Sequence, residues 1–350
     1  MSLSAFDHPY LSGLVGDEET GRLFSAEAEI KAMLAFEDAL AGAEESAGVI
    51  PAHAAQTISA ACQTFVPDLE RLRAGTGLDG VVVPELVRQL RQAVGGEAAQ
   101  YVHFGATSQD VIDTALVLRL KPLCGLFNDR LFSIENAFEE MDRVFGARSL
   151  MGRTRMQAAI PISVADRIRA WREPLTRYRR RLENFSTTGF AVQFGGAAGT
   201  LEKLGEKAEL VRKTLAFRLS LGDAAQWQSQ RDRVVELGGI LTMISGSLGK
   251  FGQDVALLAQ MGGEIELAGG GGSSAMAHKQ NPVAAEVLVA LARFNAVQIS
   301  ALQQSMVHEQ ERSGAAWTLE WLVLPPLVMA TGTALRLAAE LAANIRSLGR

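Results

Sequence analysis

The densest group of reactive side chains in this 350-residue sequence follows a run of four glycines, residues 269–272. Two hydroxyls, an imidazole, an ammonium and an amide come within the next nine residues, on Ser273, Ser274, His278, Lys279 and Asn281. Glycine reaches left-handed conformations and lets the backbone lie close to a ligand. Pro282 then precedes an apolar pattern of helical period, so the free N–H groups of a helix start face these side chains. The stretch predicts an anion site, although the glycines alone favour a flexible linker.

A second polar stretch, residues 101–110, precedes another helical pattern. Thr107 and Asp110 have the spacing of a capping box, in which a hydroxyl and a carboxylate each accept a free backbone N–H. Thr107 and Ser108 are therefore expected at a helix N-terminus, which favours an anion. Most capping boxes are purely structural, and a lone histidine such as His103 is typically satisfied by neighbouring backbone.

A third stretch, residues 152–161, reads GRTRMQAAIP. The three stretches together resemble the motifs of the fumarase/aspartase superfamily, which includes argininosuccinate lyase, adenylosuccinate lyase and the 3-carboxy-cis,cis-muconate cycloisomerases. Residues 272–282 match the family segment Gly-Ser-Ser-x-Met-Pro-x-Lys-x-Asn-Pro, except that Ala277 replaces proline. The match runs through nearly the whole sequence.

The resemblance implies a role for each matching residue. The family serine that matches Ser273 exchanges the substrate α-proton, and the lysine and asparagine that match Lys279 and Asn281 bind a carboxylate. Whether Ser273 or Lys279 handles the proton stays open. Thr107 and Ser108 are implied to hold a carboxylate, and His103 to act as an acid, as in adenylosuccinate lyases. The other implied substrate-binding residues are Arg155, Gln157, His278 and Arg312.

Two departures narrow the resemblance to the cycloisomerases. Arg155 replaces the histidine of the ordinary lyases, and a guanidinium cannot shuttle a proton but can grip a carboxylate with two N–H groups. The segment 308–321, with Arg312 between a glutamate and a glycine and with Trp317 and Trp321 beyond, resembles the cycloisomerase pattern in particular. Both features imply a substrate that is rich in carboxylates.

The activity that the resemblance implies is conversion of 3-carboxy-cis,cis-muconate to carboxymuconolactone, with no cofactor or metal. A cycloisomerase for a sulfonated muconate analogue is one alternative, because arginines bind either anion. An adenylosuccinate-type lyase and a non-catalytic structural protein, as among the crystallins of this superfamily, are the other two. Retention of Ser273, Lys279 and Asn281 together speaks against the structural protein.

Composition excludes several other classes. Hydrophobic residues make up 48% of the chain and aromatic residues 6%, which suits packed helices. The net charge of −5 provides no basic field for nucleic acid. Cys62 and Cys124 have no metal-like spacing. No leader is recognisable, and the most apolar stretch, Trp321 to Ala330, is broken by two prolines, so we expect a cytoplasmic protein that does not enter a membrane.

The fold is expected to be all-α. Residues 1–100 are predicted to form a small helical domain, with helices over 25–48, 51–62 and 84–94. Residues 101–350 are predicted to form a bundle, with helices over 111–120, around Pro174, after Pro282 and over 327–345. The resemblance implies that relatives continue into a C-terminal helical domain that is absent from this sequence.

An apolar seam runs from Val234 to Leu258 in steps of three and four residues. Gly238, Gly239, Gly246 and Gly249 beside it are expected to permit close helix packing. Such a seam requires a bundle, and a family site that collects its motifs from three subunits implies a homotetramer. Seven arginines between 167 and 181 are expected on a solvated or inter-subunit face.

Overall fold

The computed structural model describes residues 4–272, 276 and 280–350. Ser273, His278 and Lys279 lie outside the described residues. Six α-helices precede the bundle: α1 (Ser12–Val15), α2 (Glu18–Leu23), α3 (Ala26–Ser46), α4 (Ala52–Thr64), α5 (Leu69–Asp79) and α6 (Val83–Val94). Six more follow: α7 (Ser108–Phe145), α8 (Val164–Thr188), α9 (Ala208–Arg218), α10 (Asp232–Met261), α11 (Val283–Gln304) and α12 (Gly314–Asn344). The prediction of an all-α fold is confirmed.

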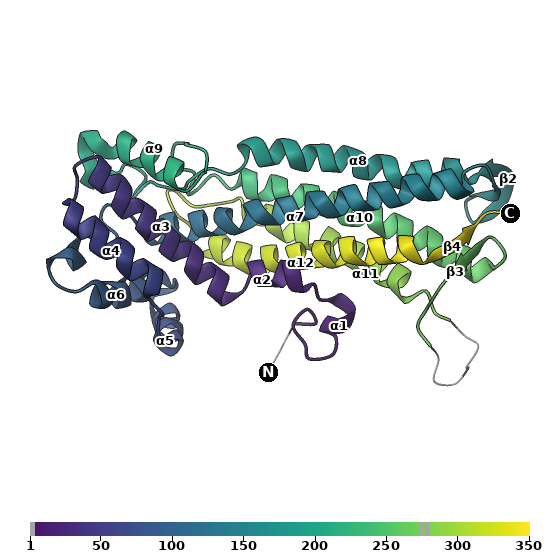
Figure 1. Ribbon diagram of the computed structural model, residues 1–350, viewed down its shortest axis with the longest axis horizontal. Helices are drawn as coiled ribbons and strands as arrows, with labels where there is room; N and C mark the ends of the chain where they lie inside the picture. The colour runs from purple at the N-terminus through teal and green to yellow at the C-terminus, as the bar shows by residue number, and fades with distance from the viewer. Residues whose placement is uncertain (1–3, 273–275, 277–279) are drawn as a thin grey trace.

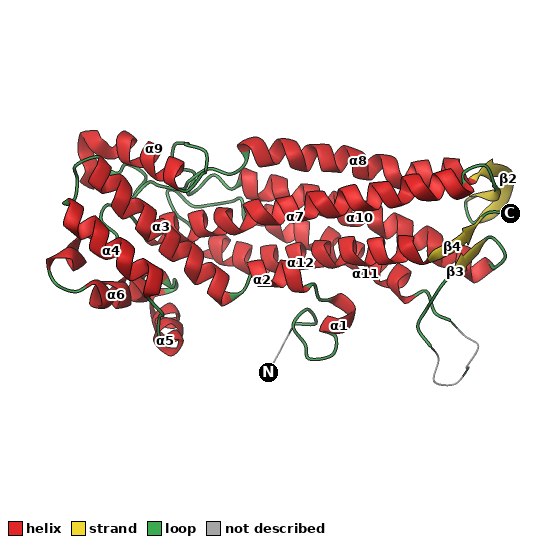
Figure 2. Ribbon diagram, in the orientation of Figure 1, coloured by secondary structure: helices red, strands yellow, loops and turns green. Residues whose placement is uncertain are grey.

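Five long helices, α7, α8, α10, α11 and α12, lie side by side as a rod (Figure 1). Helices α3 to α6 gather at one end, which we call the helical end. Four short strands lie at the opposite end, which we call the strand end (Figure 2). Helix α7 begins at the helical end and finishes at the strand end, and its 38 residues span about 57 Å at a rise of about 1.5 Å per residue.

The strands form two antiparallel pairs, of which the first is a hairpin. β1 (Ser149–Thr154) pairs with β2 (Gln157–Ser163), and β3 (Ile265–Leu267) pairs with β4 (Ile345–Leu348). The second pair joins the segment before the glycine run to the end of α12. Both pairs are too small to change the fold class, but they fix the loops at the strand end.

The predicted seam of α10 is the centre of the bundle core. Its apolar residues from Val234 to Leu258 are all buried, and α11 packs more extensively on α10 than on α12. Gly238 and Gly249 permit this approach, because a Cβ on either would lie 2.4 Å from a side-chain atom of α11. Gly239 and Gly246 have nothing within 4 Å of that position, so the prediction was wrong for those two.

Several helices are longer than predicted because their prolines do not end them. Helix α7 contains Pro122 and continues 25 residues past the predicted end at Leu120, to Phe145. Helix α8 runs unbroken through Pro174, and α12 runs through Pro325 and Pro326. Packing against neighbouring helices offsets the local loss of backbone hydrogen bonds.

The length of these helices also bears on whether the chain has segments that could span a membrane. Helices α10, α11 and α12 are each long and apolar enough to cross a membrane by length and composition alone. The two prolines that were expected to break the stretch from Trp321 to Ala330 lie inside the continuous helix α12. In the bundle these helices bury apolar side chains against one another.

The segment before α7 contains three α-helices that the sequence did not predict: the short α1 and α2, and the longer α5. Helix α5 has two internal glycines and buries only Leu72, so its apolar pattern is weak. Its start is set by Asp68, whose carboxylate accepts the N–H groups of Glu70 and Arg71. One hydrophobic cluster joins α3 to α6 with the start of α7 and with α9, and a second fills the rod.

Candidate active site

The first motif lies at the start of α7, as predicted. The Thr107 N–H donates to Asp110 Oδ2 at 3.0 Å, and the Thr107 side chain accepts an N–H of the first turn, so the capping box forms. Asp110 also accepts the N–H groups of Gly195 and Gly196, both at 2.9 Å. These bonds tie the helix start to the loop that follows α8. Burial nevertheless raises the pKa of Asp110 to about 6.

A cavity of about 620 Å³ opens beside this helix start. His103, Thr107 and Ser108 line one side, and Arg88 and Arg91 of α6 line the other. Two guanidiniums, two hydroxyls and a helix N-terminus converge on one space, which gives the cavity the chemistry to hold an anion. Three of the predicted site residues are therefore gathered here by one chain.

His103 is held against a buried carboxylate of α3. Its Nδ1 lies 2.6 Å from Glu37 Oε1. Its backbone is left-handed, with φ of 63°. Glu37 is 2% exposed and lies on the apolar face of its helix, so the pair joins two segments that are 66 residues apart. The histidine is thus satisfied by a side chain and not by neighbouring backbone.

Arg312 lies at the same helical end. Its Nε donates to Gln109 Oε1 at 2.9 Å, and its Nη2 donates to the Ala197 carbonyl at 3.3 Å. Gln109 directly follows Ser108, so the structure brings Arg312 to the first motif. The resemblance placed Arg312 in the substrate site, and its position here fits that assignment.

A buried charge network supports this end of the rod. Arg231 donates to Asp113 at 2.7 and 3.1 Å and to Glu320 at 2.9 and 2.6 Å. Burial lowers the pKa of the Arg231 guanidinium, but the two carboxylates outweigh burial and raise it. Trp317, which the cycloisomerase-like segment contributes, donates its Nε1–H to Asp113 at 3.2 Å. That tryptophan is a structural anchor in this chain.

Arg155 and Gln157 lie at the strand end, at the turn between β1 and β2. Arg155 and Met156 have φ of 47° and 68°, which makes the turn, and both predicted residues are exposed. Neither side chain bonds to any other residue that the structure describes. Arg153, two positions earlier, is instead paired with Glu264 at 3.0 Å. Arg155 is the guanidinium of this turn that is left for a ligand.

Asn281 also lies toward the strand end, at the neck of the glycine loop. Its N–H and carbonyl each pair with Gly271 at 2.9 Å, which closes the loop into an antiparallel bridge. Pro282 is the N-cap of α11, so this helix begins directly after the proline, as expected. The predicted residues Ser273, His278 and Lys279 fall outside the described residues, within the loop that this bridge closes.

The predicted site is thus divided between the two ends of the rod. His103, Thr107, Ser108 and Arg312 lie at the helical end. Arg155, Gln157 and Asn281 lie at the strand end. Since α7 spans the distance between them, a single chain cannot bring the two groups together.

The chain was compared with protein families and with solved structures. The family model described as "Lyase" matches residues 17–297. A 3-carboxy-cis,cis-muconate cycloisomerase of Pseudomonas aeruginosa is 41% identical over 327 residues, which are 91% of this chain and 71% of that protein. A crystal structure of the 3-carboxy-cis,cis-muconate lactonizing enzyme of Pseudomonas putida has a TM-score of 0.91 at 36% identity, covering 97% of this chain and 77% of that one.

The chain belongs to this lyase family. An N-acetyl-S-(2-succino)cysteine lyase of Enterococcus italicus is a further relative, 32% identical over 88% of this chain and 69% of that protein. The prediction of the fumarase/aspartase superfamily, and of its cycloisomerases as similar proteins, is confirmed. The roles of individual residues in this lyase stay predictions.

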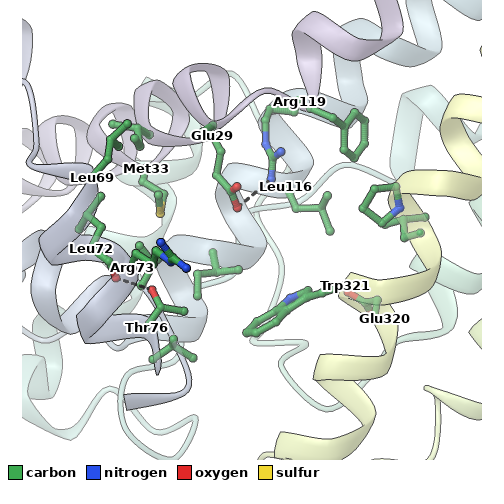
Figure 3. A pocket seen from close by; sticks show the side chains of 18 residues that line it. Glu29, Met33, Leu69, Leu72, Arg73, Thr76, Leu116, Arg119, Glu320 and Trp321 are labelled. Atoms are coloured by element: carbon green, nitrogen blue, oxygen red, sulfur yellow. Dashed lines mark hydrogen bonds and ion pairs between the residues drawn. The ribbon is translucent and has the colours of Figure 1, made fainter. Parts of the chain in front are cut away.

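A second cavity of this lyase, of about 430 Å³, lies further along α7, beside Leu116 and Arg119 (Figure 3). Its wall is mainly apolar, with Met33, Leu69, Leu116 and Trp321 around it. Of the charged residues that line it, Arg119 is paired with Glu29 at 3.3 Å, and Glu320 with Arg231; Arg73 also lines the cavity. No predicted site residue within the described ranges lines it, so we do not assign it to the reaction.

Sequence reasoning missed several residues of this lyase that lie near the predicted site. Glu37 is one of them, and a signal was available: Glu37 and Glu44 fall seven residues apart on the otherwise apolar stripe of α3. Arg88 and Arg91 gave no signal, because arginines on an amphipathic helix are ordinary. His308 is half-buried, and burial and Arg231 lower its pKa. Among the described residues, no group of His, Cys, Asp and Glu side chains could hold a metal ion.

Proposed function

We propose that this chain is a cofactor-independent cycloisomerase that converts 3-carboxy-cis,cis-muconate to carboxymuconolactone. The observation that carries the proposal is the Arg312–Gln109 contact. It ties the cycloisomerase-like segment to the start of α7, the helix start whose Thr107 and Ser108 line the 620 Å³ cavity, and a guanidinium can grip a carboxylate with two N–H groups. The similarity to the cycloisomerases supports the choice within the family.

The reaction needs carboxylates to be held and one proton to be delivered. A substrate carboxylate oxygen forms a C–O bond to an alkene carbon, and the electron pair moves toward the carbon next to another carboxylate. The developing negative charge spreads onto that carboxylate, where cations and N–H groups stabilise it. A protein acid then protonates the carbon and is reprotonated by water. Both reacting groups belong to one molecule, so positioning supplies much of the rate.

The roles in this proposal follow the two ends of the rod. Thr107, Ser108 and Arg312 hold carboxylates at the helical end. Arg155, Gln157, His278 and Asn281 hold carboxylates at the strand end, and Ser273 or Lys279 delivers the proton. Because the ends are far apart in one chain, each site takes its groups from different subunits of a homotetramer.

The surface of α11 supports this assembly. Only 28% of its most apolar 18-residue window is buried within the chain, compared with 67% for α12. Val297 on α11 is 68% exposed. Pairing of such faces in a shared bundle would remove this apolar surface from water. A soluble, cytoplasmic tetramer that binds neither nucleic acid nor membrane is therefore part of the proposal.

The test is to mix the purified protein with 3-carboxy-cis,cis-muconate and a chelator, and to follow the ultraviolet absorbance of the conjugated diene. We expect rapid loss of absorbance and formation of a lactone. No loss, by a protein shown to be folded and tetrameric, would contradict the proposal. The sulfonated analogue, adenylosuccinate and N-acetyl-S-(2-succino)cysteine are then the substrates to compare, and inactivity on all of them would leave a structural role.

A further inference from the structure

The contact between His103 and Glu37 has no counterpart among the predicted roles. The two side chains meet at 2.6 Å between Nδ1 and Oε1. The Glu37 side chain is 1% exposed and the His103 side chain is 14% exposed. Glu37 comes from α3 and does not line the cavity, whereas His103 lines it together with Thr107 and Ser108.

We propose that Glu37 is a positioning residue that fixes the tautomer and the orientation of His103. A carboxylate only accepts hydrogen bonds, so Nδ1 must carry the hydrogen of this contact. The other ring nitrogen, Nε2, is then the one presented to the cavity. This inference rests on the proposed function for its chemical meaning, but the tautomer can be measured without any substrate.

The left-handed backbone conformation of His103 indicates that the surrounding structure holds this residue in place. A left-handed conformation in a residue other than glycine costs on the order of 1 kcal/mol or more and persists only where its surroundings enforce it. The Arg91 guanidinium donates to the carbonyl of Val102 at 3.0 Å, and Val102 itself is fully buried. On the other side of the histidine, the Phe104 N–H donates to the Tyr101 carbonyl at 3.3 Å. The loop is therefore held on both sides of His103, whose Nδ1 contacts Glu37.

The environment of Glu37 also argues against a merely structural contact. Its second oxygen, Oε2, is buried and has no hydrogen-bond partner among the described residues. A buried carboxylate with one partner is costly, and an amide or an apolar side chain would pack there at lower cost. Burial, together with the charges of Glu37 and Asp38, raises the pKa of the nearby Cys62 to about 12, so the thiol offers no alternative proton carrier.

The consequence for the reaction is a defined path for one proton. Because Glu37 keeps the Nδ1 hydrogen in place, a proton enters or leaves the imidazole at Nε2, which faces the cavity. Once Nε2 has taken up a proton and the ring is an imidazolium, the same nitrogen can donate to a carboxylate that is held by Thr107 and Ser108. Glu37 itself touches neither the substrate nor the reacting atoms.

Glu44 provides a matched control on the same face of α3. It is fully buried, and neither of its carboxyl oxygens has a partner in the described part of the chain. Burial and the charge of Glu37 raise the pKa of Glu44 to about 9, so it is neutral at pH 7. Glu44→Gln therefore changes neither the net charge nor the contact to His103.

The experiment is ¹⁵N NMR of histidine-labelled protein, with His103→Gln used to assign the ring signals, together with steady-state kinetics. In the wild type and in Glu44→Gln we expect His103 as the Nδ1–H tautomer. In Glu37→Ala we expect the Nε2–H tautomer and a kcat that is lower by about 10- to 100-fold, with KM little changed. Glu37→Gln should keep the Nδ1–H tautomer, because its amide oxygen still accepts, and should recover part of the lost kcat.

Three results would overturn the proposal: an Nε2–H tautomer in the wild type, an unchanged tautomer in Glu37→Ala, or an unchanged kcat in that variant. If Glu37→Ala does not fold, Glu37→Asp takes its place, because its shorter side chain withdraws the carboxylate from Nδ1. Absence of turnover in the wild type would contradict the proposed function and leave the tautomer measurement intact.

Discussion

The two ends of the rod hold their charged groups in different ways. At the helical end the charged side chains have partners within the chain: Arg231 contacts Asp113 and Glu320, Glu37 contacts His103, and Arg312 donates a hydrogen bond to Gln109. At the strand end Arg155 lies exposed at a hairpin turn without a partner among the described residues. The strand end also has a paired arginine, Arg153 with Glu264, but its Arg155 is a group that only a ligand or another subunit can engage.

This difference separates the residues that stabilise the fold from those reserved for binding. A buried pair costs desolvation, which close contacts must offset, so removing one member leaves an uncompensated charge. An exposed arginine costs nothing to hold and contributes little to stability. Arg231 and Arg155 are therefore the same residue type in opposite roles.

The same substitution at both ends tests this contrast. Arg231→Met leaves two buried carboxylates without their cation, and we expect the free energy of unfolding to fall by about 3–5 kcal/mol. Arg155→Met should change it by no more than about 0.5 kcal/mol. Urea denaturation of the two variants measures both effects. Similar losses in the two variants would show that the ends do not differ as described.

Activity should respond in a complementary way. Arg155→Met and Ser108→Ala are each expected to lower kcat/KM by about 10²- to 10³-fold, since each removes a group that stabilises developing charge. When the two inactive variants are dissociated, mixed and reassembled, about a quarter of the sites should regain both intact groups if a site draws its two ends from different subunits of a symmetric oligomer.

The control for that mixture is Ser108→Ala mixed with Arg312→Ala. Ser108 and Arg312 both lie at the helical end, so a site takes both groups from a single chain. Whichever variant supplies that chain, one of the two groups is missing, and no activity should return. Recovery in this control, or none in the first mixture, would contradict a site shared between chains.

The sequence predicted elements that have a local or periodic pattern of side chains. It did not predict features that depend on packing between elements. The seam from Val234 to Leu258 and the capping box at Thr107 are local patterns, and both were confirmed. The continuous helix through Pro325 and Pro326 was not predicted, because only packing in the bundle offsets the local cost of proline.

Motif spacing is local, so it predicts site residues that belong to one element and misses contacts between elements. Motif spacing located Thr107 and Ser108 because both belong to one helix start. The partner of His103 lies 66 residues away on another helix, and the cavity arginines belong to a third element. Contacts between elements have no signature in local spacing, so only the arrangement of α3, α6 and α7 reveals them.

The smallest expected effect is a difference in pH dependence between the two ends. Burial and the charge of Glu37 raise the pKa of Glu44, at the helical end, from 4.5 to about 9. At the strand end burial raises the pKa of Glu264, but the Met151 N–H and the Arg153 guanidinium outweigh burial and lower it below 4.5. The folded protein thus binds a proton at Glu44 that the unfolded chain has released by pH 7.

Stability should therefore fall as the pH rises from about 7 to about 8, by at most about 1.4 kcal/mol for the single proton at Glu44. The contribution of Glu44 is fully present below pH 4.5 and is lost as the pH rises through about 9. Glu264 has the opposite sign, since its contribution is lost only as the pH falls below 4.5. Urea midpoints at the two pH values should become less pH-dependent in Glu44→Gln and keep their slope in Glu264→Gln. If the pH dependence were instead lost in Glu264→Gln and kept in Glu44→Gln, the carboxyl without a compensating cation would lie at the strand end, which would contradict the contrast between the ends.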